Sequence, residues 1–190
     1  GRMVKFESAY GTEPGAVLVQ DGGKISAPAA PAQAGYAFQG WFQGSASTKF
    51  DFDTPITGNI TLTAVWTLNA PAVEPGPFTG TYKEGETVVT LTADVEHDAS
   101  GLNYTYQWYK VNNGEGEDTK VGTNSQTLPL ATVAESGSYY VQVTAEDNKG
   151  LTSQPGTSDS VTVVISKAKP DAPAADTGYT IDFDAETIDI

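Results

Sequence analysis

Hydrophobic and polar residues alternate with a period of two along most of this chain. The alternation is clearest over residues 88–95, 139–145 and 161–165, where β-branched and aromatic side chains recur on one face. This period is typical of half-buried β-strands, because successive side chains point to opposite faces of a sheet. No stretch has the 3.6-residue period of an amphipathic helix, and prolines interrupt the alanine-rich segment at 28–34. We therefore predict a mainly β protein.

Proline-rich segments divide the pattern into modules. Such segments are extended and disfavour helix, so we interpret them as linkers or linker-strand transitions. We predict a first module over residues 1–67, a linker over 68–77 and a second module over 78–167. Residues 168–190 are predicted to hold a further linker and the first strand of a truncated module, because apolar and acidic residues alternate from 179 onward.

The charge balance excludes two classes of partner. The chain has 190 residues, 10 Lys+Arg against 24 Asp+Glu, and a formal net charge of -14. Nucleic acids and anionic membrane surfaces both require a basic face. No apolar run approaches the ~20 residues of a membrane span. We therefore expect no nucleic-acid partner and no membrane insertion by this fragment.

The inventory of chemically reactive residues is small. The chain has no Cys and one His, His97, which removes disulfides, thiolate metal sites and Cys nucleophiles. A Ser-His-Asp triad would depend on His97, and no Gly-x-Ser-x-Gly elbow occurs. Asp94, Glu96 and Asp98 alternate beside it, which could be an acid/base arrangement but favours a solvated strand edge, with His97 on the surface. We predict no enzyme, no catalytic residue, no cofactor and no metal.

The first module carries a recognisable motif. Residues 35–41 read Gly-Tyr-x-Phe-x-Gly-Trp, and residues 64–66 close the module with Ala-x-Trp. Together with residues 4–6, 22–25 and 50–57, they resemble the Listeria–Bacteroides (internalin B-type) repeat of bacterial surface proteins. The resemblance implies a small β-grasp-like fold and no catalytic residues.

The aromatic residues of this module have two interpretations. A unit of ~65 residues is near the lower limit for an independent core and can spare few large side chains. We therefore assign the following residues to the core: Phe6, Tyr36, Phe38, Trp41, Phe52, Leu62 and Trp66. The alternative is a sugar-stacking platform made by Tyr10, Trp41 and Phe42.

Two smaller features of the first module are also open to a functional interpretation. Asp51 and Asp53 alternate with Phe50 and Phe52, which predicts a strand with its acids in solvent rather than a metal site. Lys5 is the candidate for an intramolecular isopeptide bond, which we expect to be absent.

The second module resembles a cysteine-free immunoglobulin-like domain of bacterial surface proteins. Residues 135–141 match the Asp-x-Gly-x-Tyr-x-Cys pattern, with Glu135 for Asp and Val141 for Cys. Residues 104–110 match the strand with the buried Trp, and Ala93 stands where the first Cys would be. The resemblance implies an immunoglobulin-like β-sandwich, giving two domains in tandem.

Side-chain packing of this sandwich follows from the resemblance. Trp108 is expected to cover Ala93 and Val141, where the sulfurs would otherwise sit. The Tyr139 hydroxyl is expected to bond the backbone near the corner that precedes its strand.

Acidic loops of the second module are candidate partner-binding sites. They lie at residues 112–118 and 146–150, between predicted strands, although such loops are more often solvated turns. The candidate residues are Glu115, Glu117, Asp118, Glu146 and Asp147. Calcium binding by the first three is not favoured, because their spacing matches no EF-hand loop.

Both resemblances point to the bacterial cell surface. We predict a non-catalytic structural or adhesive segment, a stalk or binding module, of a secreted or cell-wall-attached protein. The alternative is a carbohydrate-binding accessory module of a larger secreted glycoside hydrolase. The expected partner is an unidentified protein or glycan outside the cell, and we expect a monomer with strand-edge contacts through the tail.

Overall fold

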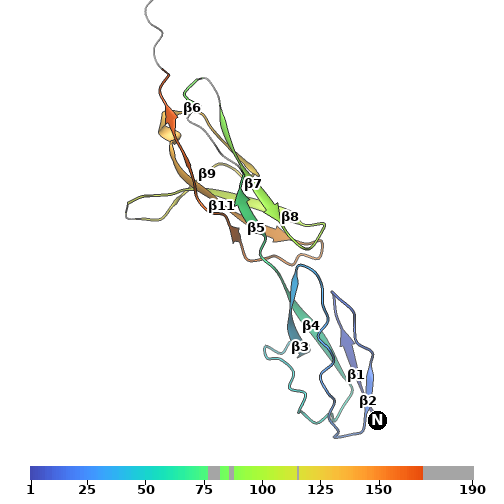
Figure 1. Ribbon diagram of the computed structural model, residues 1–190. Coiled ribbons are helices and arrows are strands. Elements are labelled where there is room, and N and C mark those ends of the chain that lie inside the picture. Colours follow the sequence, from blue (N-terminus) through green and yellow to red (C-terminus); the bar gives the residue numbers. More distant parts are fainter. Residues whose placement is uncertain (77–81, 86–87, 115, 169–190) are drawn as a thin grey trace, which may run out of the picture.

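The structure is a computed structural model, and it describes residues 1–76, 82–85, 88–114 and 116–168. Two β modules follow one another along the chain, end to end in space (Figure 1). In the described ranges, the helical content is a single 3-10 turn. The predicted mainly β fold with two tandem domains is therefore confirmed. The predicted tail strand lies outside the described residues.

The first module is a four-stranded mixed sheet. Its strands are β1 (Arg2–Glu7), β2 (Val17–Val19), β3 (Tyr36–Gln43) and β4 (Ile60–Leu68), in the order β2-β1-β4-β3. The central pair β1–β4 is parallel and both outer pairs are antiparallel. A parallel centre flanked by antiparallel edges is the β-grasp-like arrangement that the resemblance implied.

A β-bulge lets strand β3 send three aromatic residues to one side. The register of β3 against β4 shifts between Phe38 and Gly40, and Gly40 has a φ of +134°, a region that favours glycine. The extra residue changes the alternation, so Tyr36, Phe38 and Trp41 all pack against the same core. Gly40 of the motif therefore permits the bulge that brings Trp41 to the core side of β3.

Aromatic side chains fill this first core, as predicted. Phe6, Trp41 and Trp66 are at most 6% exposed. The Trp41 indole meets the Phe6 ring edge-on, with centroids 4.9 Å apart, and Phe38 lies between the two indoles. The remaining predicted members are Leu62, which is fully buried, and Tyr36 and Phe52, which are partly buried against the cluster.

Residues 50–53 form a turn, although their alternation predicts a strand. The backbone N–H of Asp53 donates to Asp51 Oδ1 at 2.9 Å, and the N–H of Phe50 donates to the Trp41 carbonyl at 2.7 Å. An aspartate side chain that bonds the backbone two residues on competes with strand pairing. The two acids remain exposed, as expected, while the Phe50 and Phe52 rings meet at 5.2 Å.

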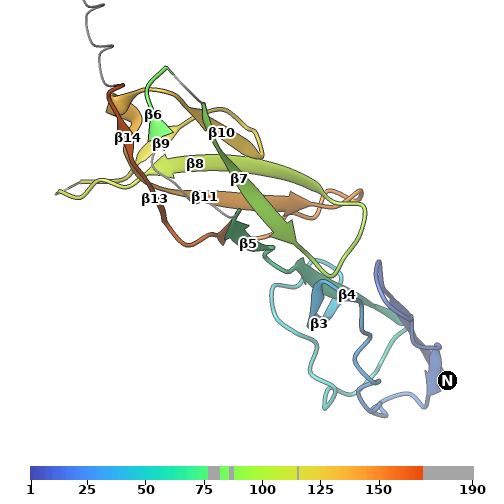
Figure 2. The same cartoon turned by 45° about the horizontal axis from the view of Figure 1, so that its top comes forward.

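The second module is a sandwich of two antiparallel sheets (Figure 2). One sheet has the order β10-β7-β5, and the other has the order β12-β11-β8-β9 with β13 also paired to β11. A short parallel pair, β6 with β14, adjoins the turn η1. The bounds are β5 Ala72–Pro75, β6 Tyr82–Lys83, β7 Val89–Glu96, β8 Asn103–Lys110, β9 Thr119–Val121, β10 Thr127–Leu130, η1 Val133–Glu135, β11 Gly137–Glu146, β12 Gly156–Thr157, β13 Val161–Val163 and β14 Ile165–Ser166.

The sandwich core matches the immunoglobulin-like expectation. Ala93, Trp108 and Val141 are each fully buried in one cluster. The Trp108 Nε1 donates to the Ser125 carbonyl at 3.0 Å, so its polar edge is satisfied. The Tyr139 hydroxyl donates to the Glu135 carbonyl, which is the predicted corner contact.

The predicted linker is shorter than its composition indicates. Leu68 is the buried last residue of β4, and β5 already begins at Ala72 and pairs with β7. Val73 enters the sandwich core. Pro75 is tolerated because it ends an outer strand, where its missing N–H breaks no ladder. Residues 69–71 therefore separate the two modules.

Candidate functional site

The candidate functional region lies where the modules meet. Figure 1 shows the short join between β4 and β5. Beside it, two turns of the second module, residues 97–100 and 147–151, lie against two loops of the first module, residues 8–11 and 33–36. Close contact at these four segments makes the junction a packed interface.

One carboxylate receives hydrogen bonds from both modules. The hydroxyls of Tyr10 and Tyr36 donate to Asp147 Oδ2 at 2.5 and 3.0 Å. The backbone N–H groups of Lys149 and Leu151 donate to Oδ1 at 2.9 Å each. Asp147 is only 5% exposed, and four donors compensate for the water it has lost. We call Tyr10, Tyr36 and Asp147 the tyrosine–aspartate clasp.

Electrostatics favours one protonation state for the clasp. Burial opposes ionisation of Asp147, but hydrogen bonds from Tyr10, the turn backbone and Tyr36 hold its pKa below the ordinary value. Burial, followed by the bond to Asp147 and its charge, raises the pKa of Tyr10 and of Tyr36. At neutral pH the clasp therefore contains an ionised carboxylate and two protonated phenols, joined by charge-assisted bonds.

A histidine and a glycine complete the junction. His97 Nε2 donates to the Asn69 carbonyl at 2.8 Å, and Nδ1 accepts from the Ala99 N–H at 2.9 Å, which assigns the neutral tautomer protonated on Nε2. His97 is thus half-buried rather than a simple surface residue. Gly35 has a φ of +80°, and a Cβ there would lie 2.6 Å from Ala99, so the two backbones approach as closely as glycine permits.

Beside the clasp, the junction leaves a crevice of about 440 Å³. The Tyr10 and Tyr36 rings stack with centroids 4.3 Å apart and form part of its wall. Lys149 places its ammonium 4.3 Å from the Tyr10 ring centroid and donates to the Ala9 carbonyl. The rest of the lining consists of small and polar residues, namely Gly11, Gln33, Ala34, Asp98, Ala99, Ser100 and Asn148.

The acidic loop residues separate into different environments. Asp147 was predicted to be a partner-binding loop acid, but its carboxylate is occupied by the clasp and its own turn. Glu146 and Glu117 are exposed. Asp118 accepts the Asn112 N–H at 2.9 Å and shapes its hairpin loop. Glu115 lies outside the described residues.

The three aromatic candidates for sugar stacking do not form one surface. Trp41 is 4% exposed in the first core, as the core interpretation predicts, and offers no ring face to a ligand. Phe42 follows it on the opposite side of β3 and is half-buried. Tyr10 alone lines a crevice, where it stacks on Tyr36.

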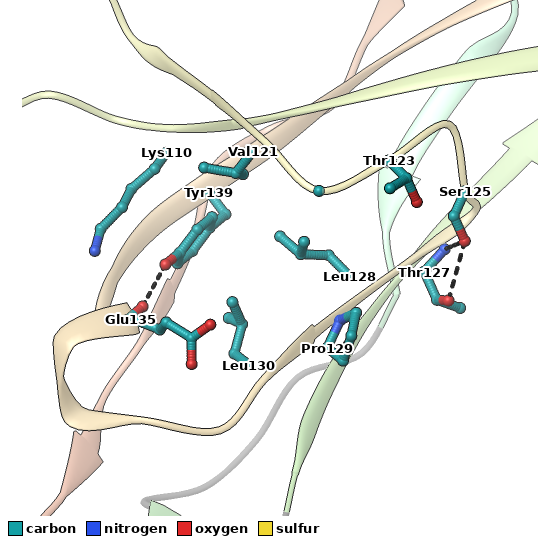
Figure 3. A pocket seen from close by; sticks show the side chains of 11 residues that line it. Lys110, Val121, Thr123, Ser125, Thr127, Leu128, Pro129, Leu130, Glu135 and Tyr139 are labelled. Carbon is teal, nitrogen blue, oxygen red and sulfur yellow. Dashed lines mark hydrogen bonds between the residues drawn. The ribbon is translucent and has the colours of Figure 1, made fainter.

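A second hollow, of about 650 Å³, opens at the side of the sandwich between β9 and β10 (Figure 3). Its centre is apolar and formed by Val121, Leu128, Leu130 and the Tyr139 ring. Pro129 lies within β10 and lacks an N–H, which weakens this edge as a site for strand addition.

The two charged groups at this hollow, those of Lys110 and Glu135, are already engaged. The Glu135 carboxylate accepts the N–H groups of Ala131 and Thr132 at 2.8 Å and the Thr132 hydroxyl at 2.9 Å, and these bonds lower the pKa of Glu135. Lys110 Nζ donates to the Ala134 carbonyl at 3.0 Å. The carboxylate therefore caps the η1 turn, and the ammonium ties β8 to it.

Outside the junction, the acidic residues that the structure describes do not gather into a reactive centre. Asp94 and Glu96 are exposed on β7, and Asp98 follows its end. Within the described ranges, no three His, Asp or Glu side chains are arranged to hold a metal ion. Lys5 is exposed on β1.

Sequence reasoning missed the clasp. It treated Tyr10 as a candidate glycan contact and Asp147 as a candidate partner-binding acid, and it assigned Tyr36 to the core. The two clasp bonds span 137 and 111 residues of sequence. The available signal was a polar turn at 146–150 and two tyrosines in the first module, which does not specify a pairing.

The chain matches two domain families in succession. Residues 3–65 match the Listeria-Bacteroides repeat domain, and residues 77–160 match the PKD domain, which is immunoglobulin-like. Domains of these types are typically non-catalytic. None of the helical turns in the described residues has the length and hydropathy needed to cross a bilayer.

Two relatives are similar to parts of the chain. A candidate membrane protein of Evansella cellulosilytica is 30% identical over 131 residues, which are 63% of this chain and 19% of that protein. A candidate Gly-rich membrane protein of the same species is 36% identical over 72 residues, 37% of this chain and 8% of that protein. This chain thus spans less than a fifth of either relative.

Two solved structures are similar to part of the chain. An Fn3-like protein from Clostridium thermocellum is 24% identical with a TM-score of 0.29, and covers 55% of this chain and 100% of that one. The FN1-FN3 domains of chicken CNTN1 are 21% identical with a TM-score of 0.32, and cover 58% of this chain and 38% of that one.

Proposed function

We propose that this chain, a Listeria–Bacteroides repeat domain followed by a PKD domain, is a non-catalytic, extracellular spacer segment of a bacterial surface protein. The two domain types fit a surface-associated structural or adhesive module. The two relatives are candidate membrane proteins, which supports a location at the cell surface. In this role the segment sets the distance and direction of whatever lies beyond it.

The single observation that carries this proposal is the packed junction. A flexible spacer joins its modules by a solvated linker, which lets each module reorient freely. Here residues 69–71 span the join, the clasp connects the modules on either side of it, and the His97–Asn69 bond holds the join against the second module. Bending would break charge-assisted bonds to Asp147 and expose a buried carboxylate. The pair therefore behaves as one stiff segment.

Surface charge suits a densely displayed segment. The chain has a formal net charge of -14, and neighbouring copies repel one another when closer than the Debye length, about 8 Å at physiological ionic strength. Such repulsion keeps adjacent segments apart without any directed contact. It supports spacing as the role, alongside the stiff junction.

Small-angle X-ray scattering tests the stiffness directly. The wild-type chain is expected to give the maximum dimension of the end-to-end arrangement. The double variant Tyr10→Phe/Tyr36→Phe, which removes both hydroxyl donors, should give a broader distribution of distances. Tyr109→Phe is the matched control, because Tyr109 lies on the outer face of the sandwich away from the junction. Identical broad distributions for all three proteins would contradict the proposal.

Surface labelling tests the location. An antibody raised against this segment should label intact cells that make the parent protein, and brief protease treatment of those cells should remove the label. Labelling that appears only after the cells are permeabilised would contradict an extracellular spacer.

A further inference from the structure

The crevice beside the clasp holds polar groups that the fold leaves unused. Asp98, Ser100 and Asn148 line it, and among the described residues their side chains make no hydrogen bond or ion pair. The Asp147 carboxylate and the His97 ring at the same junction are, by contrast, hydrogen-bonded. The three crevice residues are exposed, and donors and acceptors that line one concave space are the usual polar part of a ligand site.

Two pinned turns present these groups. The Asp147 carboxylate accepts the N–H groups of the following turn, and that turn carries Asn148 and Lys149. His97 Nδ1 accepts the Ala99 N–H in the turn that carries Asp98. Asp147 also bonds the first module, and His97 also bonds the join at Asn69. The backbone that carries the crevice groups is therefore held in place before any ligand arrives, which lowers the entropy cost of binding.

Aromatic and small residues shape the crevice for a hydroxylated ligand. The stacked Tyr10 and Tyr36 rings border the crevice. Tyr36 covers one face of Tyr10 and the Lys149 ammonium lies over the other, so the apolar ring edges remain for contact with the C–H groups of a sugar. Gly11, Ala34 and Ala99 leave room beside those edges. With a volume of about 440 Å³, the crevice lies in the range of small-molecule sites, which often form between domains.

The charges in the crevice favour a neutral ligand. Its lining has one ammonium, Lys149, and one carboxylate, Asp98, so an ion of either sign meets both attraction and repulsion. The remaining polar groups are the amides of Gln33 and Asn148 and the Ser100 hydroxyl, which pair with hydroxyl groups as donor or acceptor. A neutral sugar presents many hydroxyls and no charge.

We propose that the inter-module crevice binds a neutral glycan, with Ser100, Asn148 and Gln33 contacting sugar hydroxyls and the edges of the tyrosine pair bordering the sugar. The site needs both modules, so it rests on the fixed junction of the proposed function. It gives the spacer an adhesive role and makes binding depend on module orientation.

NMR titration of the full chain tests this site. The probes are four neutral tetrasaccharides, built from glucose in β-1,4 linkage, glucose in α-1,4 linkage, xylose and N-acetylglucosamine. At about 10 mM sugar, which detects a Kd in the millimolar range, at least one probe should shift the backbone amides of residues 98–100 and 147–149. Absence of shifts there with all four sugars overturns the proposal.

Variants separate a specific site from general stickiness. Ser100→Ala/Asn148→Ala removes unused groups without touching the clasp, and should weaken binding about tenfold or more. Tyr109→Ala is the control, because Tyr109 stacks on Tyr140 on the outer face of the sandwich, with centroids 4.9 Å apart, and offers a similar aromatic pair. Binding that survives the double variant, or that Tyr109→Ala removes, overturns the assignment to the crevice.

Module orientation, measured on the same samples, keeps the two proposals distinct. A fixed orientation without sugar binding rejects the glycan site and leaves the spacer intact. Independent tumbling of the modules rejects the stiff spacer, and it also rejects a glycan site that needs both modules in a fixed orientation. A concentration-dependent shift of the same amides without sugar identifies a second copy of the chain as the occupant instead, and also overturns the glycan proposal.

Discussion

Replacement of Asp147 by asparagine tests the energetic role of the clasp. The substitution keeps the size and planarity of the side chain and removes its charge. With its carbonyl oxygen toward the turn, the amide can still accept the Lys149 and Leu151 N–H groups. Its NH₂ group then faces the Tyr10 and Tyr36 hydroxyls, which must turn around to accept instead of donating.

The expected cost follows from those two bonds. Each charge-assisted bond of roughly 2 kcal/mol is exchanged for a neutral bond of roughly 1 kcal/mol, so Asp147→Asn should lower the free energy of unfolding by about 2 kcal/mol. In a Tyr10→Phe/Tyr36→Phe background there are no hydroxyls to reorient. The same substitution should then cost about 2 kcal/mol less, which gives a coupling energy of about 2 kcal/mol.

Urea denaturation of the four proteins of this cycle measures the coupling. Tryptophan fluorescence reports on both modules, because Trp41 and Trp66 lie in the first core and Trp108 in the second. An unchanged m-value confirms that stability alone has changed. A coupling energy below about 0.5 kcal/mol, meaning additive costs, would refute the reasoning and assign Asp147 to its own turn alone.

Three further substitutions or conditions have defined outcomes. Gly35→Ala should broaden the distribution of module orientations in scattering experiments, because its Cβ would meet Ala99. The control is Gly44→Ala, which has a φ of +56° and open space around it and should carry backbone strain without this effect. Equal behaviour of the two variants would contradict close packing at Gly35. Tyr139→Phe should lower the unfolding free energy by about 1 kcal/mol through loss of its corner bond, and an unchanged urea midpoint would contradict that. The pKa of Asp147 is lowered in the folded chain, so its contribution to the unfolding free energy is present above the unfolded pKa near 3.9 and is lost as pH falls through the folded pKa. Acid titration should therefore show the difference in unfolding free energy between wild type and Asp147→Asn closing below about pH 4. A difference that stays constant down to pH 2 would contradict the assignment.

Alternation predicted the strands well because half-buried strands impose it directly. It identified the inward face of β11, where Tyr139, Val141 and Val143 are buried. It was wrong at residues 50–53, since the Asp51 side chain bonds its own backbone there. Alternation describes the faces of a strand and contains no information on such local competition.

The junction could not be predicted in the same way. Periodicity indicates that a turn such as 147–151 is polar and exposed, but not which surface lies opposite. Asp147 looks like any acid in a loop until Tyr10 and Tyr36 are placed beside it by the fold of another module. The join at 69–71 is shorter than the predicted linker, because a proline such as Pro75 favours a linker although it lies in strand β5.

Residual dipolar couplings test the central claim most directly. Couplings measured separately for residues 3–65 and for the described residues between 72 and 168 each yield an alignment tensor. A stiff junction predicts that the two tensors share one orientation and one magnitude, and that they diverge in Tyr10→Phe/Tyr36→Phe. Tensors of clearly different magnitude in the wild-type chain would show that the modules move independently and would contradict the account.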